Sequence, residues 1–138
     1  MIDPLLSASR LASAGLEAQS LRMRVVSENL ANAQSTGASP GADPYARKTV
    51  TFRAELDRAA GVASVRLREI GTDTAPFRTE HDPASPAADE NGNVKLPNVN
   101  MLVEMADMRE ANRSYEANLQ VIKQARAMVA SVIDLLKS

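Results

Sequence analysis

Between residues 101 and 136, apolar side chains recur at alternating steps of four and three. The stripe comprises Met101, Met105, Met108, Asn112, Tyr115, Leu119, Ile122, Arg126, Val129, Ile133 and Leu136. Only two of its positions, Asn112 and Arg126, are polar. A repeat averaging about 3.5 residues keeps one narrow seam turned toward a partner helix while both helices supercoil. The pattern therefore predicts a long C-terminal helix, within residues 98–138, that needs a partner along its length.

The beginning of the chain also has helical periodicity, from about residue 4 to residue 33. Pro4 suits the first turn of a helix, and Asp3 is a suitable N-cap. One apolar stripe contains Leu5, Ala12, Leu16, Met23, Val26 and Leu30, and a second contains Leu11, Ala14, Ala18, Leu21 and Val25. A face this broad should meet more than one neighbour. Small side chains around Gly15 would let another backbone approach closely, and the helix should end near Asn32.

Residues 37–97 differ in character, because they hold six of the seven prolines and five of the six glycines. Short alternating runs predict strands, and Asn91-Gly92 is a strong signal for a tight turn. The predicted strands cover residues 48–53, 63–69, 75–80 and 93–96. Residues 81–92 have the composition of a disordered loop. We expect a small β-rich insert with too few apolar residues for a large core.

These patterns together predict a mainly α fold with three parts. Residues 1–36 form an N-terminal helix, residues 37–97 the β-rich insert, and residues 98–138 a C-terminal helix that pairs with the first as a coiled-coil-like core. Asn98 or Asn100 would cap the second helix. Its apolar face widens toward the C-terminus, so a two-helix hairpin would leave part of it in water. This surplus predicts contact with neighbouring chains.

Composition excludes several classes of protein. A formal net charge of −1 and 3% aromatic residues disfavour a nucleic-acid binder, which normally has a basic surface and stacking side chains. The sequence has no cysteine, which excludes disulfides, thiolate zinc sites and cysteine nucleophiles. We expect no cleavable secretion signal at the N-terminus, because residues 1–6 lack a basic region and a long apolar run. We also expect no membrane span.

Candidate catalytic and metal-binding residues are few. The single histidine, His81, lies between Glu80 and Asp82, an arrangement compatible with acid–base or metal chemistry. A solvated loop is the interpretation we favour. Three acidic residues of the C-terminal helix, Glu104, Asp107 and Glu110, are better read as solvated charges that complement the helix dipole. With no phosphate-binding glycine loop and no nucleophile elbow in the sequence, we predict no catalytic, cofactor-binding or metal-binding residues and no enzyme activity.

The two polar positions of the C-terminal stripe have two interpretations each. A buried Asn112 would fix the register of paired helices at some cost in stability, or the residue lies where the stripe reaches solvent. Arg126 would extend its charged end into water or form an ion pair between subunits. Met101, Met105 and Met108 are typical of adaptable packing.

Several short motifs are shared with one known family. Asn29-Leu30-Ala31-Asn32, Thr36-Gly37 and Tyr45-Ala-Arg47 resemble the N-terminal signature of bacterial flagellar rod and hook proteins. In most members the tyrosine follows the glycine directly, and the intervening residues 38–44 resemble the proximal-rod branch of the family. Two more stretches agree, residues 91–99 and the motif Arg113, Ser114, Tyr115, Glu116, Ala117 and Asn118.

This resemblance implies a structural subunit of the flagellar basal-body rod, the drive shaft that transmits motor torque. Such proteins pair their terminal helices and assemble helically. They reach the periplasm-spanning rod through the flagellar type III export system without a cleaved signal. The implied partners are copies of itself, other proximal and distal rod proteins, the rod-base adapter and the MS ring. The resemblance implies no nucleic acid, small-molecule substrate, cofactor or membrane-spanning segment.

The residues expected at helix-pairing and subunit interfaces are Leu16, Met23, Val26, Asn29, Leu30 and Asn32, together with the C-terminal stripe from Met101 to Leu136. For Asn29 we favour a hydrogen bond between subunits over a role in ending the first helix. The free monomer should have mobile or partly unfolded ends. The alternative from another class is a soluble coiled-coil adapter or export chaperone that forms a discrete dimer.

Overall fold

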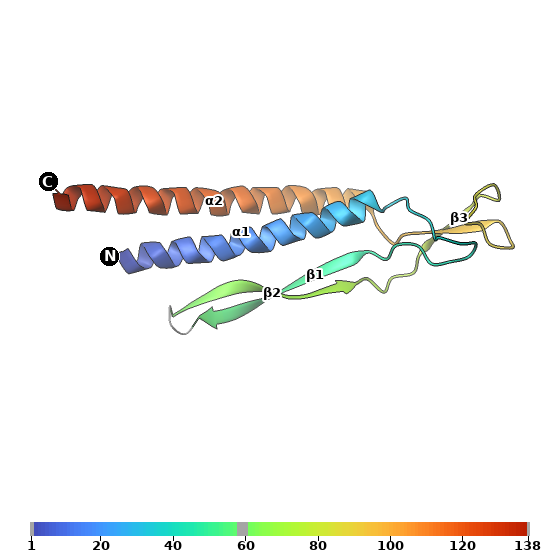
Figure 1. The fold of residues 1–138 in the computed structure, drawn as a ribbon, viewed down its shortest axis with the longest axis horizontal. Helices are drawn as coiled ribbons and strands as arrows, with labels where there is room; N and C mark the ends of the chain where they lie inside the picture. Colours follow the sequence, from blue (N-terminus) through green and yellow to red (C-terminus); the bar gives the residue numbers. More distant parts are fainter. Residues whose placement is uncertain (1, 58–60, 138) are drawn as a thin grey trace. The chain divides into compact units, whose positions relative to one another are not determined.

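A computed structural model of the chain describes residues 2–57 and 61–137. In chain order its elements are α1 (Ile2–Ala31), β1 (Lys48–Asp57), β2 (Val62–Thr72), β3 (Arg78–His81), β4 (Asn93–Leu96) and α2 (Met101–Lys137). Figure 1 shows α1 and α2 as continuous helices, of 30 and 37 residues, with the strands between them along the chain. The predicted architecture of two terminal helices and a β-rich middle is confirmed. The described helices contain no stretch apolar and long enough to cross a membrane.

Side chains at the helix ends explain where the helices stop and start. Asn100 caps α2, because its Oδ1 accepts hydrogen bonds from the backbone N–H of Leu102 at 3.0 Å and of Val103 at 3.4 Å. At the end of α1, the Asn32 side chain donates back to the Glu28 carbonyl at 2.8 Å. Both positions agree with the predictions from the sequence. Asn100 was one of two possible caps, and the first helix was expected to end near Asn32.

The strands form two separate two-stranded sheets, β1 with β2 and β3 with β4. The second pair is antiparallel, with Arg78 opposite Leu96 and His81 opposite Asn93. All four strands fall near their predicted positions. The predicted strand over residues 75–80 starts later, at Arg78, because Asp73 accepts a hydrogen bond from the Ala75 N–H in a tight turn.

The run from residue 81 to residue 92, predicted to be disordered, has a defined conformation instead. The Asp89 carboxylate accepts hydrogen bonds from the backbone N–H of Asn91 at 2.8 Å and of Asn93 at 2.9 Å. Gly92 has a φ of 77°, which the tight turn requires. Ala87 is buried. Local side-chain-to-backbone bonds therefore order a segment whose composition is typical of a loop.

The chain divides into two compact units. The first contains residues 1–23, 51–69 and 109–138, and the second contains residues 24–50 and 70–108. Both helices therefore pass through the two units. The buried apolar side chains of the first unit are Ala12, Ala18, Ala111, Ile122 and Ala125, and those of the second are Val25, Val26, Ala33, Ala87, Val94 and Val99. Small side chains thus fill the first core, whereas valines dominate the second.

Within the first unit, α1 and α2 approach each other closely. A Cβ atom built at Gly15 would lie 2.8 Å from the side-chain atoms of Asn118, which is too close for real contacts. Further along α1, Arg22 pairs with Glu110 at 3.7 Å. These contacts show that the two helices run in opposite directions there. They also confirm that the small residues of α1 permit a close approach.

The buried face of α2 is rotated from the predicted stripe. Met108, Tyr115, Ile122 and Val129 belong to the stripe and are buried or half-buried. Its other members, Met101, Met105, Asn112, Leu119, Arg126, Ile133 and Leu136, are exposed in the single chain. The buried face instead includes Glu104, Ala111, Asn118 and Ala125. In the first unit, the close contact with α1 favours small side chains such as Ala111 and Ala125 over large ones. Whether the exposed members meet other subunits stays a prediction.

Candidate functional site

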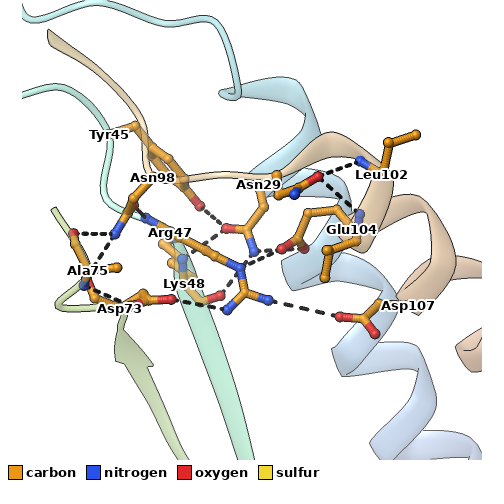
Figure 2. Close-up of polar contacts among 12 residues, drawn as sticks. Asn29, Tyr45, Arg47, Lys48, Asp73, Ala75, Asn98, Leu102, Glu104 and Asp107 are labelled. Atoms are coloured by element: carbon orange, nitrogen blue, oxygen red, sulfur yellow. Dashed lines mark hydrogen bonds and ion pairs between the residues drawn. The ribbon is translucent and has the colours of Figure 1, made fainter. Parts of the chain in front are cut away.

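A buried polar cluster lies in the second unit, where the end of α1 meets the start of α2 (Figure 2). Asn29, in the last turn of α1, is 1% exposed, and Glu104, in the first turn of α2, is fully buried. Buried polar groups require hydrogen-bond partners to offset the loss of water. The chain segments before and after the first sheet supply those partners.

The Asn29 amide makes all four hydrogen bonds available to it. Its Nδ2 donates to the Lys48 carbonyl at 3.0 Å and to Glu104 Oε2 at 3.1 Å. Its Oδ1 accepts from the Lys48 N–H at 2.9 Å and from the Tyr45 hydroxyl at 2.8 Å. The expected hydrogen bond from Asn29 is thus made within the chain instead of to another subunit. The residue instead fixes the start of β1 against α1, and no hydrogen-bonding capacity remains for a partner.

Glu104 is also placed differently from the prediction. The sequence indicated a solvated charge, but the side chain is buried, and its second oxygen, Oε1, accepts a hydrogen bond from Arg47 Nε. A buried carboxylate is stable only with a close counter-charge and further hydrogen bonds. Arg47 and Asn29 provide both. Asp107 is half-buried, whereas the third acid, Glu110, is exposed as predicted.

Arg47 connects the cluster to three acidic side chains. Besides Glu104, its guanidinium pairs with Asp73 at 3.5 Å and with Asp107 at 3.9 Å. Burial opposes the charged guanidinium, but the hydrogen bond and charge of Glu104, with the charges of Asp73 and Asp107, raise the pKa of Arg47 above its ordinary value. Arg47 therefore stays charged at every accessible pH.

The backbone around Arg47 is held by Asn98. The Arg47 N–H donates to Asn98 Oδ1 at 2.8 Å, and Asn98 Nδ2 donates to the carbonyls of Asp73 at 3.2 Å and Ala75 at 3.0 Å. The Asp73 N–H in turn donates to the Arg47 carbonyl at 2.8 Å. Asn98, considered as a helix cap, thus joins the segments before β1 and after β2 (Figure 2).

Two further side chains border the cluster. Lys48 Nζ donates to Glu28 Oε2 at 2.7 Å, and this bond lowers the pKa of Glu28 and raises the pKa of Lys48. Burial raises the pKa of the Tyr45 hydroxyl, which points at Asn29. The Tyr45 hydroxyl therefore keeps its proton at neutral pH.

This geometry favours a structural role over a chemical one. Each charged side chain of the cluster faces an opposite charge or a hydrogen bond, an arrangement that holds chain segments together. Among the described residues, no three His, Asp or Glu side chains could hold a metal ion. His81 is exposed, as expected, but it ends strand β3 instead of lying in a loop, and its Nδ1 is 3.3 Å from Asn93 Oδ1.

The motif residues divide into groups with different structural tasks. Asn29, Tyr45 and Arg47, separated in sequence, come together in the cluster. Gly37 permits a close approach of the Ala42 backbone, because a Cβ atom there would lie 2.5 Å from the Ala42 carbonyl oxygen. Asn118, the last residue of the C-terminal motif, packs on Gly15 in the first unit.

Sequence reasoning missed Glu104, Lys48, Asp73 and Asn98 as members of the cluster. A signal for Glu104 was present, because it lies four residues before Met108 and seven before Ala111, on the face that proves to be buried. An acid on a buried face, in a chain whose motif contains an arginine, is a candidate ion pair. The sequence has no comparable signal for Lys48, Asp73 and Asn98.

Comparison with known proteins agrees with a structural role. Residues 90–135 match the family model described as the C-terminal part of flagellar basal body rod FlgEFG proteins. The chain is 64% identical over 137 residues to the flagellar basal-body rod protein FlgC of Agrobacterium fabrum, covering 99% of both chains. The proteins of that name from Borreliella burgdorferi and Salmonella typhimurium are 38% and 35% identical, with at least 95% of each chain covered.

The fold, the buried cluster and these matches define a structural protein of the bacterial flagellar basal body. Within that class, the chain belongs to the FlgC family of flagellar basal-body rod proteins. The resemblance seen in the sequence is thereby confirmed, as is the basal body as its location. The alternative of an adapter or export chaperone has no support from the relatives.

Proposed function

We propose that this rod protein is a subunit of the proximal rod, where it assembles helically with copies of itself and with other rod proteins. The single observation that carries the proposal is apolar surface that the chain leaves exposed on α2. In the first unit these side chains are Leu119, Val121, Met128, Ile133, Leu135 and Leu136, and in the second they are Met101, Leu102, Val103 and Met105. Burial of one such side chain contributes roughly 1.5–3 kcal/mol, so assembly would be strongly favoured.

In this proposal, residues 1–36 and 98–138 pair as a coiled-coil-like core and residues 37–97 form the insert. The antiparallel contact between Gly15 and Asn118 supports pairing in the first unit. The exposed Asn112 and Arg126 would then act between subunits. Asn112 would fix the register of the paired helices, and Arg126 would form an ion pair. Leu16, Met23, Leu30 and Asn32, half-buried in the single chain, would complete the interface on α1.

The buried cluster would give the subunit stiffness. Asn29, Arg47 and Glu104 tie both helices to the segments that flank the first sheet. Force applied to one helix would then pass to the insert through directional bonds as well as through apolar contacts. A torque-transmitting shaft needs this property, because sliding between elements would dissipate the rotation.

The finer points follow from the family. Export through the flagellar type III system without a cleaved signal, a place in the periplasm-spanning rod, and contact with the rod-base adapter, the MS ring and the distal rod all belong to this proposal. A structural subunit needs no catalytic residue or cofactor, and the matched charges of the cluster support this.

Complementation of a strain that lacks its own copy tests the proposal. Leu119→Asp and Ile133→Asp put a charge on exposed apolar positions of α2, and we expect loss of the protein from purified basal bodies and loss of swimming. Gln120→Asp is the matched control on an exposed polar position of the same helix, and it should swim normally. Circular dichroism of the three purified variants should be alike. Normal swimming of both apolar-to-Asp variants would contradict assembly through this surface.

A further inference from the structure

One asparagine of the second unit lies in a chemically labile sequence. Asn91 is exposed, and it is the one asparagine of the chain that glycine follows. An asparagine before glycine is the dipeptide most prone to deamidation, because glycine has no side chain to obstruct its own backbone nitrogen. In an unfolded chain, Asn91 is therefore the preferred position for this modification.

Deamidation of Asn91 needs a particular arrangement of two groups. The backbone nitrogen of Gly92 loses its proton to a base in solution and attacks Asn91 Cγ. The Cγ–Nδ2 bond breaks, ammonia leaves, and a succinimide ring forms. Water then opens the ring at either of its carbonyl groups, which leaves aspartate or isoaspartate at position 91. The Gly92 nitrogen must therefore be free of hydrogen bonds and turned toward the side chain that precedes it.

The folded turn opposes both requirements. The Gly92 N–H donates to the Asp89 carbonyl at 3.0 Å, so its proton is engaged, and a deprotonated nitrogen would face that oxygen. The Gly92 carbonyl accepts from the Asp82 N–H at 2.9 Å, which fixes the other side of the same residue. A Cβ atom at Gly92 would lie 3.0 Å from the side chains of both His81 and Pro83, so the residue has little room to turn.

The Asp89 carboxylate holds the turn together. Its Oδ1 accepts from the Asn91 N–H at 2.8 Å and from the Asn93 N–H at 2.9 Å, on either side of the reactive bond. The Asp89 N–H also donates to the Asn93 carbonyl at 2.9 Å. Rotation about the Asn91 Cα–C bond, which would bring the Gly92 nitrogen to Cγ, breaks these contacts. The reaction therefore requires local opening of the turn.

We propose that Asn91 is a deamidation site of the unfolded chain, and that the turn closed by Asp89 stops the reaction when the chain folds. The modification marks chains that stay unfolded and damages them. Isoaspartate adds one carbon atom to the backbone between residues 91 and 92, just before β4, where Gly92 packs closely. The inference concerns the chain by itself and does not depend on the proposed function.

Incubation of the purified chain at mildly alkaline pH, with and without urea, tests the inference. Mass spectrometry of the peptide that contains Asn91 measures the modified fraction, and an isoaspartyl methyltransferase detects the isoaspartate. We expect deamidation in buffer to be slower than in urea by about tenfold or more, because opening the turn breaks several hydrogen bonds. Equal rates with and without urea would overturn the proposal.

Substitutions in the turn test the role of Asp89. Asp89→Ala removes the acceptor of two hydrogen bonds, and its rate of deamidation in buffer should rise about tenfold. Glu90→Ala, the matched control, removes the neighbouring exposed carboxylate and should leave the rate unchanged. Asp89→Asn keeps an acceptor oxygen and should react more slowly than Asp89→Ala. In urea all four chains should react alike. Equal rates of Asp89→Ala and Glu90→Ala in buffer, or unequal rates in urea, would contradict protection by the turn.

Discussion

Asn29 Nδ2 donates a hydrogen bond to Glu104 Oε2 at 3.1 Å, joining two residues that lie 75 positions apart in the chain. One belongs to the last turn of α1 and the other to the first turn of α2. The same two side chains also bind Lys48 and Arg47, at the start of the first sheet. Two helices and a strand therefore meet at one pair of polar groups.

Polar contacts at this junction specify geometry more strictly than apolar packing would. Apolar side chains tolerate small shifts and rotations, whereas an amide with four partners fixes direction and distance. Burying Glu104 has a large desolvation cost, and Arg47 offsets it only in one arrangement. The cluster thus selects one position of the insert against the helix ends.

The first prediction concerns the buried carboxylate. Glu104→Gln leaves Arg47 without its closest counter-charge, and we expect the free energy of unfolding to fall by about 2–3 kcal/mol. Asp73 and Asp107 remain near Arg47 and limit the loss. Urea unfolding followed by Tyr45 fluorescence, in a Tyr115→Phe background, measures it. Glu110→Gln, on an exposed part of α2, should change stability by less than about 0.5 kcal/mol. Equal effects of the two substitutions would contradict the buried ion pair.

The second prediction concerns pH. Burial raises the pKa of Tyr45 in the folded chain above its ordinary value of about 10. The folded state therefore keeps the phenolic proton more firmly than the unfolded state. Its contribution to stability is complete below about pH 10 and is lost as the pH rises through the folded-state pKa.

Tyr45→Phe isolates this effect. Near pH 7 the variant should be less stable by about 1 kcal/mol, because the hydrogen bond to Asn29 is lost. Above about pH 10 the difference in stability should shrink, since only the native chain has a phenol at position 45 that can ionise. Urea unfolding by circular dichroism at several pH values measures both parts. A difference that stays constant up to about pH 11 would rule out the burial effect on Tyr45.

The third prediction concerns the close contact of α1 and α2. Replacing a glycine in the middle of a helix by alanine normally stabilises by about 1 kcal/mol. At Gly15 we expect no such gain, because the new Cβ would lie 2.8 Å from the Asn118 side chain. Adding Asn118→Ala should restore the gain, so that the double variant is more stable than Gly15→Ala alone. Thermal unfolding followed by helical circular dichroism measures these differences, and a full gain from Gly15→Ala alone would contradict the contact.

The sequence predicts the helices and strands well, because local signals define them. The apolar repeats, the Asn100 cap and the Asn91-Gly92 turn depend on neighbouring residues, and each is found where expected. The exception is the run of residues 81–92, which was predicted to be disordered. Hydrogen bonds to the Asp89 carboxylate give it a defined conformation despite its loop-like composition. Local composition cannot report such bonds.

The long-range contacts were harder to predict. The resemblance grouped Asn29, Tyr45 and Arg47 as motif residues, but not as one cluster, because their meeting depends on the turn between α1 and β1. The apolar stripe also coincides only in part with the face of α2 that is buried within the chain. Hydrophobicity alone gives Leu119 more weight than Ala111, yet the close helix contact buries Ala111 and leaves Leu119 exposed. Side-chain size determines which face of α2 is buried, and the spacing of apolar residues carries no information about size.

The last prediction exchanges the two groups of the Asn29–Glu104 pair. Asn29→Asp alone puts a second carboxylate beside Glu104, and it also removes the donor to Lys48 O. We expect a loss of about 3 kcal/mol or more at neutral pH. Because protonation of one carboxyl group relieves the repulsion, this loss should be smaller below about pH 4. Asn32→Asp, at the partly exposed end of α1, should cost much less.

Combining Asn29→Asp with Glu104→Gln restores one amide and one carboxylate to the site with their positions reversed. The amide introduced at position 104 would again donate to a carboxylate, and Arg47 would keep a nearby negative charge. We therefore expect the double variant to be more stable than the sum of the two single losses predicts, by about 1 kcal/mol or more. Urea unfolding of the four chains gives this coupling energy. A coupling near zero would mean that the two side chains do not act on each other, and that the junction is held by apolar packing alone.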